Sequence, residues 1–334
     1  MNVKNPFLGR AQKRTLNVQR RIILFIRYFI CLMFFLTCLQ DRAAYSQPDD
    51  IPVIPARHLF DIEAGFRNPS DVAVGENGHI YVLDGANNQV KIFDSKGTYV
   101  SSFGSPGKGN GKFNYPLGID ISKDGSVYIA DTGNGLVQVF NPKGRFLFQF
   151  DVNVAGSPKP PDPVDVAVDE SLNRCYVVDN DNHRILVYKK DGSRLITKWG
   201  TRGEKPGEFR FPFLAAMDNQ ATLYVVDVLN TRVQAINQEG RTMADIGKWG
   251  VDRGQFYRPK GVSVDKKDRI YISDSFLGVI QVFKRYRKFM GILGNADAEI
   301  LKFKTPTGIC VDDGLRIYVV EMWLNRVRVF QILE

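Results

Sequence analysis

The sequence has few of the residues from which most active centres are built. It contains four cysteines and three histidines among 334 residues. Beyond the first 46 residues only Cys175 and Cys310 remain, which excludes a disulfide-stabilised scaffold. His58, His79 and His183 lie in unrelated sequence contexts, so a three-histidine zinc centre is not expected.

The sequence also lacks the common motifs of catalysis and an excess of charge in its main part. It contains no Gly-x-Ser-x-Gly elbow, no phosphate-binding P-loop and no Cys-x-x-Cys motif. The net charge is +9, but residues 1–46 hold eight of the 45 Lys and Arg residues and one of the 36 acidic residues. The rest of the chain is therefore close to neutral, and its charge gives no support for nucleic-acid binding.

Residues 1–46 predict a signal peptide or an N-terminal membrane anchor. A basic stretch precedes the apolar run Ile22–Leu39, whose uncharged part Tyr28–Leu39 is typical of a signal peptide and short for a membrane span. Small residues at Ala44 and Ser46 suit cleavage before residue 47, and the alternative is an uncleaved anchor. In both cases we expect the rest of the chain to be extracytoplasmic (periplasmic, secreted or anchored facing outward), with membrane contact only through this segment if it is uncleaved.

A unit of 47 or 48 residues recurs six times after this segment. Each copy contains a five-residue string, such as IYVLD or VYIAD, that ends in an acidic residue. A proline precedes that acid by 15 or 16 residues. The acids are Asp84, Asp131, Asp179, Asp227, Asp274 and Glu321, and the prolines are Pro69, Pro116, Pro163, Pro212, Pro259 and Pro306.

Each unit predicts four short strands, because runs rich in Val, Ile, Tyr and Phe alternate with Gly, Asn and Asp turns. A sheet with two apolar faces must be covered on both, and radial stacking of six such sheets achieves this. The predicted fold is all-β, a six-bladed β-propeller of four-stranded antiparallel blades over residues 47–334. The blades are expected to start near residues 69, 116, 163, 212, 259 and 306.

The sixth unit has sequence for three strands only before Glu334. The segment of about residues 53–65 precedes the first unit and has no other strand partner. We therefore expect it to complete the last blade and to close the ring non-covalently.

The units resemble NHL repeats, whose pattern runs from a proline through Val-Tyr-Val-Ala-Asp and a Gly-Asn-His-Arg turn to Ile-Gln-Val-Phe. DTGNGLVQVF from Asp131 and DNDNHRILVY from Asp179 carry this resemblance, which spans about residues 53–334. It implies a six-bladed propeller and leaves activity open, because such folds host many functions. Proteins of similar architecture include an amidating lyase, and resemblance to it would imply a zinc-dependent enzyme. The histidine cluster that this activity needs has no counterpart here.

The repeated acids are predicted to be structural, because a carboxylate at the end of a strand accepts backbone N–H groups and fixes a turn. Asp71 and Asp165 are different, since they stand near the expected central channel, where other units have Gly or Leu. Two carboxylates suit Ca²⁺ or Mg²⁺ but form an incomplete ligand set. No cofactor is expected, and a cation at the channel mouth is the alternative.

The turns that follow the acids differ between the two halves of the ring. Units one to three have small or polar residues there, whereas units four to six have large apolar ones. Contiguous apolar residues in loops indicate an interaction surface. The alternatives are that they fold inward or that residues 47–56 cover them. The predicted partner-binding residues are Phe213, Leu229, Phe276, Leu277, Met322 and Trp323.

These features predict a non-catalytic binding or scaffold module of the cell envelope that binds a protein partner as a monomeric propeller. The alternative function is a metal-dependent hydrolase or lyase at the channel mouth, which the resemblance to enzymes of similar shape implies. Neither alternative involves nucleic acid.

Overall fold

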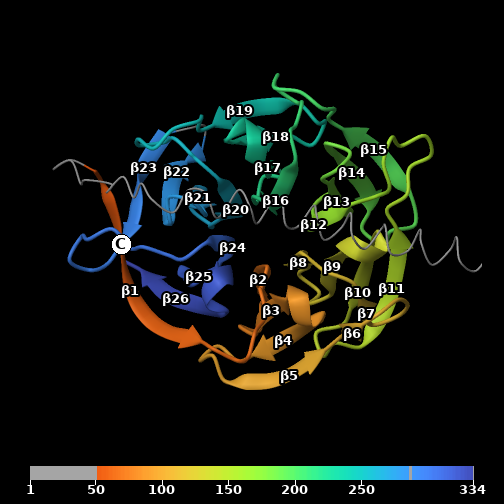
Figure 1. The fold of residues 1–334 in the computed structure, drawn as a ribbon, viewed down its shortest axis with the longest axis horizontal. Helices are drawn as coiled ribbons and strands as arrows, with labels where there is room; N and C mark the ends of the chain where they lie inside the picture. Colours follow the sequence, from red (N-terminus) through yellow and green to blue (C-terminus); the bar gives the residue numbers. More distant parts are fainter. Residues whose placement is uncertain (1–50, 286–287, 334) are drawn as a thin grey trace, which may run out of the picture. The chain divides into compact units, whose positions relative to one another are not determined.

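The structure is a computed structural model, and it describes residues 51–285 and 288–333. The predicted leader, residues 1–46, lies outside these ranges. Among the described residues, no helix has the length and apolar character needed to cross a membrane. The described chain is built from β-strands and short 3₁₀ turns, and its sheets are arranged around a common centre (Figure 1).

Each of the first three repeats forms a four-stranded antiparallel sheet whose strands lie in sequence order. Blade one contains β2 (Asp71–Val74), β3 (Ile80–Asp84), β4 (Gln89–Phe93) and β5 (Tyr99–Phe103). Blade two contains β8 (Gly118–Ile121), β9 (Val127–Asp131), β10 (Leu136–Phe140) and β11 (Phe146–Asp151). Blade three contains β12 (Pro163–Asp169), β13 (Arg174–Asp179), β14 (Arg184–Lys189) and β15 (Leu195–Trp199).

The remaining three repeats follow the same order. Blade four contains β16 (Pro212–Met217), β17 (Leu223–Asp227), β18 (Arg232–Ile236) and β19 (Thr242–Ile246). Blade five contains β20 (Pro259–Val264), β21 (Arg269–Asp274), β22 (Val279–Lys284) and β23 (Lys288–Gly294). Blade six contains β24 (Pro306–Val311), β25 (Arg316–Glu321) and β26 (Arg326–Ile332). A short parallel pair, β6 (Ser105–Pro106) with β7 (Lys112–Phe113), lies between blades one and two.

The strand β1 (Val53–Ile62) completes blade six, as the sequence predicts. Its residues from Ala56 onward pair antiparallel with β26. Its first three residues also pair in parallel with β23 of blade five, which the sequence does not predict. A Cβ on Gly291 of β23 would lie 2.5 Å from the carbonyl oxygen of Pro52, so glycine is required for this approach. β1 therefore joins blades five and six into one eight-stranded sheet.

The hydrophobic core lies between neighbouring blades. The second strand of every blade contributes a tyrosine that is at most 2% exposed. Tyr81 of blade one, for example, belongs to the same apolar cluster as Ile119 and Phe140 of blade two. Each blade thus buries its two faces against its two neighbours, which is why isolated repeats are not expected to be stable.

The order of the strands assigns the loops to two faces. In an antiparallel blade the turn between the second and third strands and the loop to the next blade emerge at the same end. We call this end the turn face, and the other end the opposite face. The first strands lie innermost in the ring and surround the channel (Figure 1).

Candidate functional site

The six repeated acids are part of the scaffold. Each is at most 1% exposed. In all six copies the carboxylate accepts the backbone N–H of the residue 17 positions earlier, at 2.6–3.0 Å. The asparagine three positions after the acid donates to it in blades one to four, at 2.8–3.0 Å. The expected role in the turn is confirmed, and the carboxylate also holds the loop that enters the blade.

A second repeated contact on the turn face links three of the blades to the blade that follows. Asn88, His183 and Asn325 stand four residues after the acid and have positive φ angles of 53–56°. Their side chains accept the backbone N–H of Tyr115, Phe211 and Asn68, respectively, in the following blade.

His183 is one of these links, and its ring also contacts Phe211 edge-on at 4.6 Å between centroids. Burial lowers the pKa of His183, and the nearby charges of Lys159 and Arg202 lower it further. Its neutral ring is therefore the form that accepts the Phe211 N–H through Nδ1. This geometry gives His183 a structural role.

The channel carboxylates Asp71 and Asp165 also tie neighbouring blades together. Asp71 accepts the N–H of Ile119 in blade two at 3.1 Å, and Asp165 accepts the N–H of Ala215 in blade four at 2.7 Å. A Cβ on Gly118 would clash with the Asp165 carboxylate, so the glycine of one repeat makes room for the aspartate of the next. Both carboxylates thus act as bridges between the innermost strands.

Burial makes these carboxylates weak acids. It raises the pKa of Asp71 to about 8. Burial also raises the pKa of Asp165 well above its usual value, and the charge of Asp71 adds to that shift. Asp120, on the inner strand of blade two, has its pKa raised to about 6, again mainly by burial. The channel therefore holds carboxyl groups that bind protons near neutral pH.

A cavity of about 320 Å³ occupies the channel between the first strands. Its lining continues into the turns between the first and second strands, so it extends toward the opposite face. Within the described residues, no group of three or more His, Cys, Asp or Glu side chains has the arrangement of a metal site. The acidic residues that line the channel cavity are Asp71, Asp120, Asp165, Asp169, Glu170 and Asp218.

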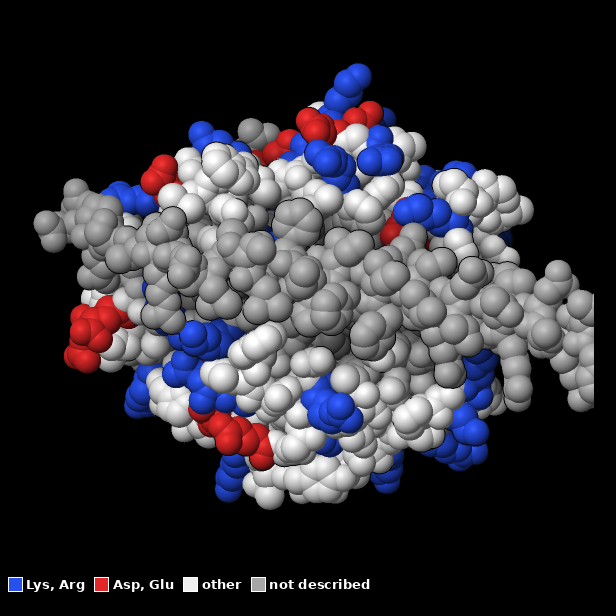
Figure 2. All heavy atoms as spheres, in the orientation of Figure 1, with Lys and Arg blue, Asp and Glu red and all other residues white. Residues whose placement is uncertain are grey.

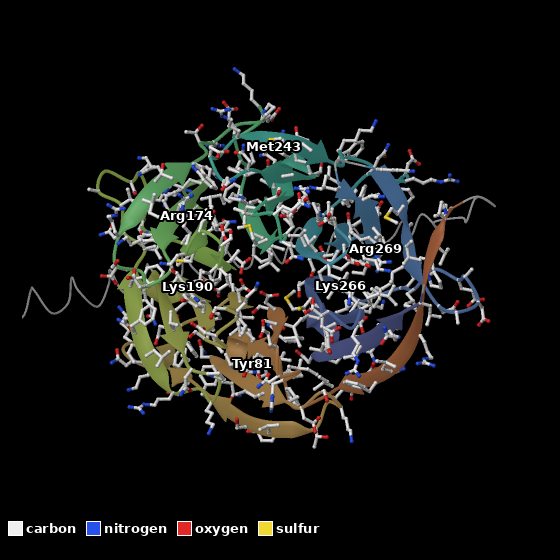
Figure 3. All side chains as sticks on the ribbon, turned by 180° about the vertical axis from the view of Figure 1, so that it is seen from behind. Tyr81, Arg174, Lys190, Met243, Lys266 and Arg269 are labelled. Carbon is white, nitrogen blue, oxygen red and sulfur yellow. The ribbon has the colours of Figure 1, made fainter. Side chains whose placement is uncertain are left out.

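Polar contacts between blades also occur on the opposite face. Lys190 of blade three pairs with Asp124 of blade two at 3.3 Å, and with Glu170 of its own blade at 2.8 Å. Arg174 donates to the carbonyl of Gln238, and Lys266 donates to that of Asp313. Figure 3 labels Arg174, Lys190 and Lys266 in the view from behind. Their basic groups are held by neighbouring turns of the protein itself.

The two cysteines beyond the leader are free thiols, as expected. Burial raises the pKa of both Cys175 and Cys310. Cys310 is one of the residues that line the channel cavity. A thiol with a raised pKa is a poor nucleophile, so neither cysteine is suited to covalent chemistry.

Three of the six predicted partner-binding residues are exposed on the turn face. Leu229 is 51%, Phe276 48% and Trp323 61% exposed. Phe213, Leu277 and Met322 are half-buried. Residues 53–55, at the start of β1, pair with β23 inside the eight-stranded sheet.

The structure adds exposed apolar residues that sequence reasoning missed. Trp249 is 70% and Val251 is 47% exposed in the loop between blades four and five, and Leu324 is 43% exposed beside Trp323. The rings of Phe276 and Tyr257 stack at 3.9 Å, and Trp249 lies 6.4 Å from Tyr257. We call the following set the apolar patch: Leu229, Trp249, Val251, Phe276, Trp323 and Leu324.

One signal in the sequence marks Trp249. Three of the loops between blades share a Gly-x-x-Gly motif, at Gly104–Gly107, Gly200–Gly203 and Gly247–Gly250. The third position of the motif pairs with the buried phenylalanine of the same loop in each case. Trp249 occupies this position where the other loops have Pro106 and Arg202, so an aligned comparison of the loops would have identified it.

The fold and the repeated contacts define a six-bladed β-propeller. A family model described as a 6-bladed beta-propeller matches residues 63–155, and a model of the NHL repeat matches residues 161–188. These two matches support an NHL-repeat propeller. No curated protein matches the sequence.

Solved propellers resemble the chain at low identity. A structural genomics protein of unknown function from Bacteroides thetaiotaomicron is 19% identical, with a TM-score of 0.62 over 84% of this chain and 75% of that one. A streptogramin B lyase is 13% identical, with a TM-score of 0.59 over 83% and 98%. An inactive virginiamycin B lyase from Staphylococcus aureus with quinupristin is 13% identical, with a TM-score of 0.57 over 81% and 82%. At these identities the likeness shows the fold alone.

Proposed function

We propose that this propeller is a non-catalytic binding module and that a protein partner docks on the apolar patch. The observation that carries the proposal is the exposure of Leu229, Phe276 and Trp323, together with Trp249, on three neighbouring blades. Large apolar residues that are contiguous and solvated are typical of interaction surfaces. Tryptophan and phenylalanine are also enriched in the centres of such interfaces.

The scaffold supports this role because it holds the patch on rigid elements. The turn that carries Leu229 follows Asp227, whose carboxylate is fully buried and fixes the entering loop at Arg210. The turn that carries Phe276 follows Asp274, which accepts the N–H of Phe276 at 3.0 Å. A surface that is ordered before binding loses little conformational entropy on docking.

We further propose that binding takes place outside the cytoplasm, in the cell envelope, and that the propeller acts as a monomer. Residues 1–46 support this location because their sequence has the pattern of an export signal.

The proposal is tested by changing the patch and capturing partners from an envelope extract. We expect the double variant Phe276→Ser/Trp323→Ser to lose a partner that the wild type retains at stoichiometric amounts. The matched control is Val100→Ser/Leu147→Ser, which removes two exposed apolar side chains from blades one and two. Equal capture by all three proteins would contradict the proposal.

The channel supports a second function, that of a hydrolase or lyase at its mouth. The supporting observation is the cavity beside Asp71 and Asp165, because carboxyl groups with raised pKa in a pocket are frequent in active sites. Metal analysis of the purified protein tests its metal-dependent form, together with thermal unfolding with and without calcium and chelator. Stoichiometric metal that stabilises the wild type, but not Asp71→Asn, would favour the enzyme.

A further inference from the structure

Basic residues lie directly beside the apolar turns of blades four to six. In each of these blades a residue of the turn donates its N–H to a carbonyl of the loop that enters the blade. The contacts are Leu229 to Arg210 at 3.1 Å, Ser275 to Arg258 at 2.9 Å, and Met322 to Thr305 at 3.4 Å. These bonds place Arg210 next to Leu229, Arg258 next to Phe276, and Lys304 next to the turn that carries Trp323.

Part of this positive charge has no acidic partner among residues 51–285 and 288–333. Lys248, Arg253 and Lys304 are exposed, and none of them forms an ion pair with a described residue. Lys248 and Arg253 are in the same loop as Trp249 and Val251. The acidic residue of that loop, Asp252, is exposed as well.

The same positions in blades one to three lack this combination. The residues that correspond to Arg210 and Arg258 are Arg67, Asn114 and Asp162, and the adjacent turns carry small or polar residues. Figure 2 shows basic side chains around the ring on the face in view, with acidic side chains between some of them. Apolar exposure and unpaired positive charge therefore coincide on the turn face of blades four to six.

We propose that the partner's docking element is an acidic peptide segment with apolar or aromatic anchor residues. This inference rests on the proposed function, because it names the chemistry of the partner for the same surface. The anchors bury against Phe276, Trp249 and Trp323, and the carboxylates of the segment face Lys248, Arg253 and Lys304. Aromatic and basic groups together also suit single-stranded nucleic acid. The patch, however, includes Leu229, Val251 and Leu324, which offer apolar contact but no ring on which a base can stack.

The charge of the ligand is tested with labelled probes and the full-length protein. Fluorescence anisotropy compares an acidic peptide, (Asp-Leu-Glu-Phe)₃, with a neutral one, (Ser-Leu-Gln-Phe)₃, a basic one, (Lys-Leu-Arg-Phe)₃, and an oligothymidine. We expect the acidic peptide to bind about tenfold more tightly than the neutral peptide at low salt, and the difference to shrink as salt is added.

Charge reversal then identifies the residues responsible. In the variant Lys248→Glu/Arg253→Glu/Lys304→Glu, the preference for the acidic peptide should disappear or invert. The matched control is Lys96→Glu/Lys108→Glu/Lys143→Glu, which should keep the preference. It reverses three exposed lysines of blades one and two that form no ion pair with a described residue.

The remaining outcomes separate this inference from the proposed function. If Phe276→Ser/Trp323→Ser abolishes peptide binding but charge reversal has no effect, the patch binds and the acidic segment is wrong. If neither variant affects binding, both ideas are wrong. Tighter binding of the oligothymidine, failure of every peptide to bind at millimolar concentration, or patch-dependent self-association in light scattering would each overturn the inference.

Discussion

The two halves of the ring share one scaffold and differ in what they present. Blades one and three place Asp71 and Asp165 in the channel, whereas blades four to six have Leu214, Gly261 and Gly308 at the equivalent positions, and blade two has Gly118. On the turn face the contrast is reversed, because the large exposed turn residues belong to blades four to six. Repeated residues thus build the fold, and departures from the repeat mark the surfaces that can be used for binding.

Replacement of the repeated acid should lower the free energy of unfolding in both halves of the ring. Asp179 in blade three and Asp227 in blade four are fully buried, and each is paired with an arginine, Arg184 or Arg232, at 2.8 and 3.0 Å. Replacement of Asp179 by alanine leaves the buried guanidinium of Arg184 without its acidic partner, which costs about 3–5 kcal/mol. Arg232 also pairs with Asp245 at 3.1 Å, so it keeps one acidic partner when Asp227 is replaced. We expect both Asp179→Ala and Asp227→Ala to lower the free energy of unfolding in urea denaturation, and Asp227→Ala to lower it less.

Double variants in which the partner arginine is also replaced provide the control for this comparison. Arg184→Met in Asp179→Ala, and Arg232→Met in Asp227→Ala, should recover part of the loss because no charge is left buried alone. A loss below about 1 kcal/mol in one half only would show that the two halves do not share a scaffold of equal strength.

Most of the fold was predictable because the information is repeated six times. The period of the acids and prolines, the β-branched strands and the lone segment before Pro69 were enough to predict the blades and the closing strand β1. The parallel pairing of β1 with β23 was not predictable, because it depends on close approach of Pro52 to Gly291 rather than on a hydrophobic pattern.

The candidate surface was predictable only in part. Leu229, Phe276 and Trp323 stand out because they replace small residues in a repeated turn. Their neighbours Leu277 and Met322 have the same character in sequence but are half-buried, since successive side chains of a tight turn point in different directions. Single-sequence reasoning also could not give the stacking of Phe276 on Tyr257, which joins residues 19 positions apart.

The buried carboxyl groups of the channel should make the stability of the protein depend on pH. Asp71 has a pKa of about 8 in the folded protein and about 3.8 when unfolded, so the folded state holds more protons between these values. Its contribution is therefore complete below about pH 4 and is lost as the pH rises to about 8. We expect the melting temperature to fall from pH 5 to pH 9, and to fall less in Asp71→Asn. Parallel pH curves for the two proteins would refute the assignment.

The contacts that His183, Asn88 and Asn325 make with the following blade should contribute less to stability than the buried ion pairs. His183→Ala removes the acceptor of the Phe211 N–H, and we expect a loss of about 1 kcal/mol. His183→Asn should retain stability, because asparagine makes the same contact at Asn88 and Asn325.

The same link has a pH signature of the opposite sign to that of Asp71. The pKa of His183 is lowered in the folded state, so its contribution is present above the unfolded value of about 6.5 and is lost as the pH falls through that region. Unfolding measured between pH 7.5 and pH 5 should show this loss in the wild type and not in His183→Asn. An equal loss in both proteins would assign the titration to another group.

Substitutions in the apolar patch are expected to have the smallest effect on stability. Trp323 is 61% exposed, and its replacement by serine should change the free energy of unfolding by about 0.5 kcal/mol or less. Phe276→Ser should cost about 1 kcal/mol, since it also removes the stack on Tyr257. Leu147→Ser in blade two, at 47% exposure, is the matched reference. If Trp323→Ser instead cost 3 kcal/mol or more, its side chain would be part of the core contacts of blade six, and the contrast between the halves would lose its functional meaning.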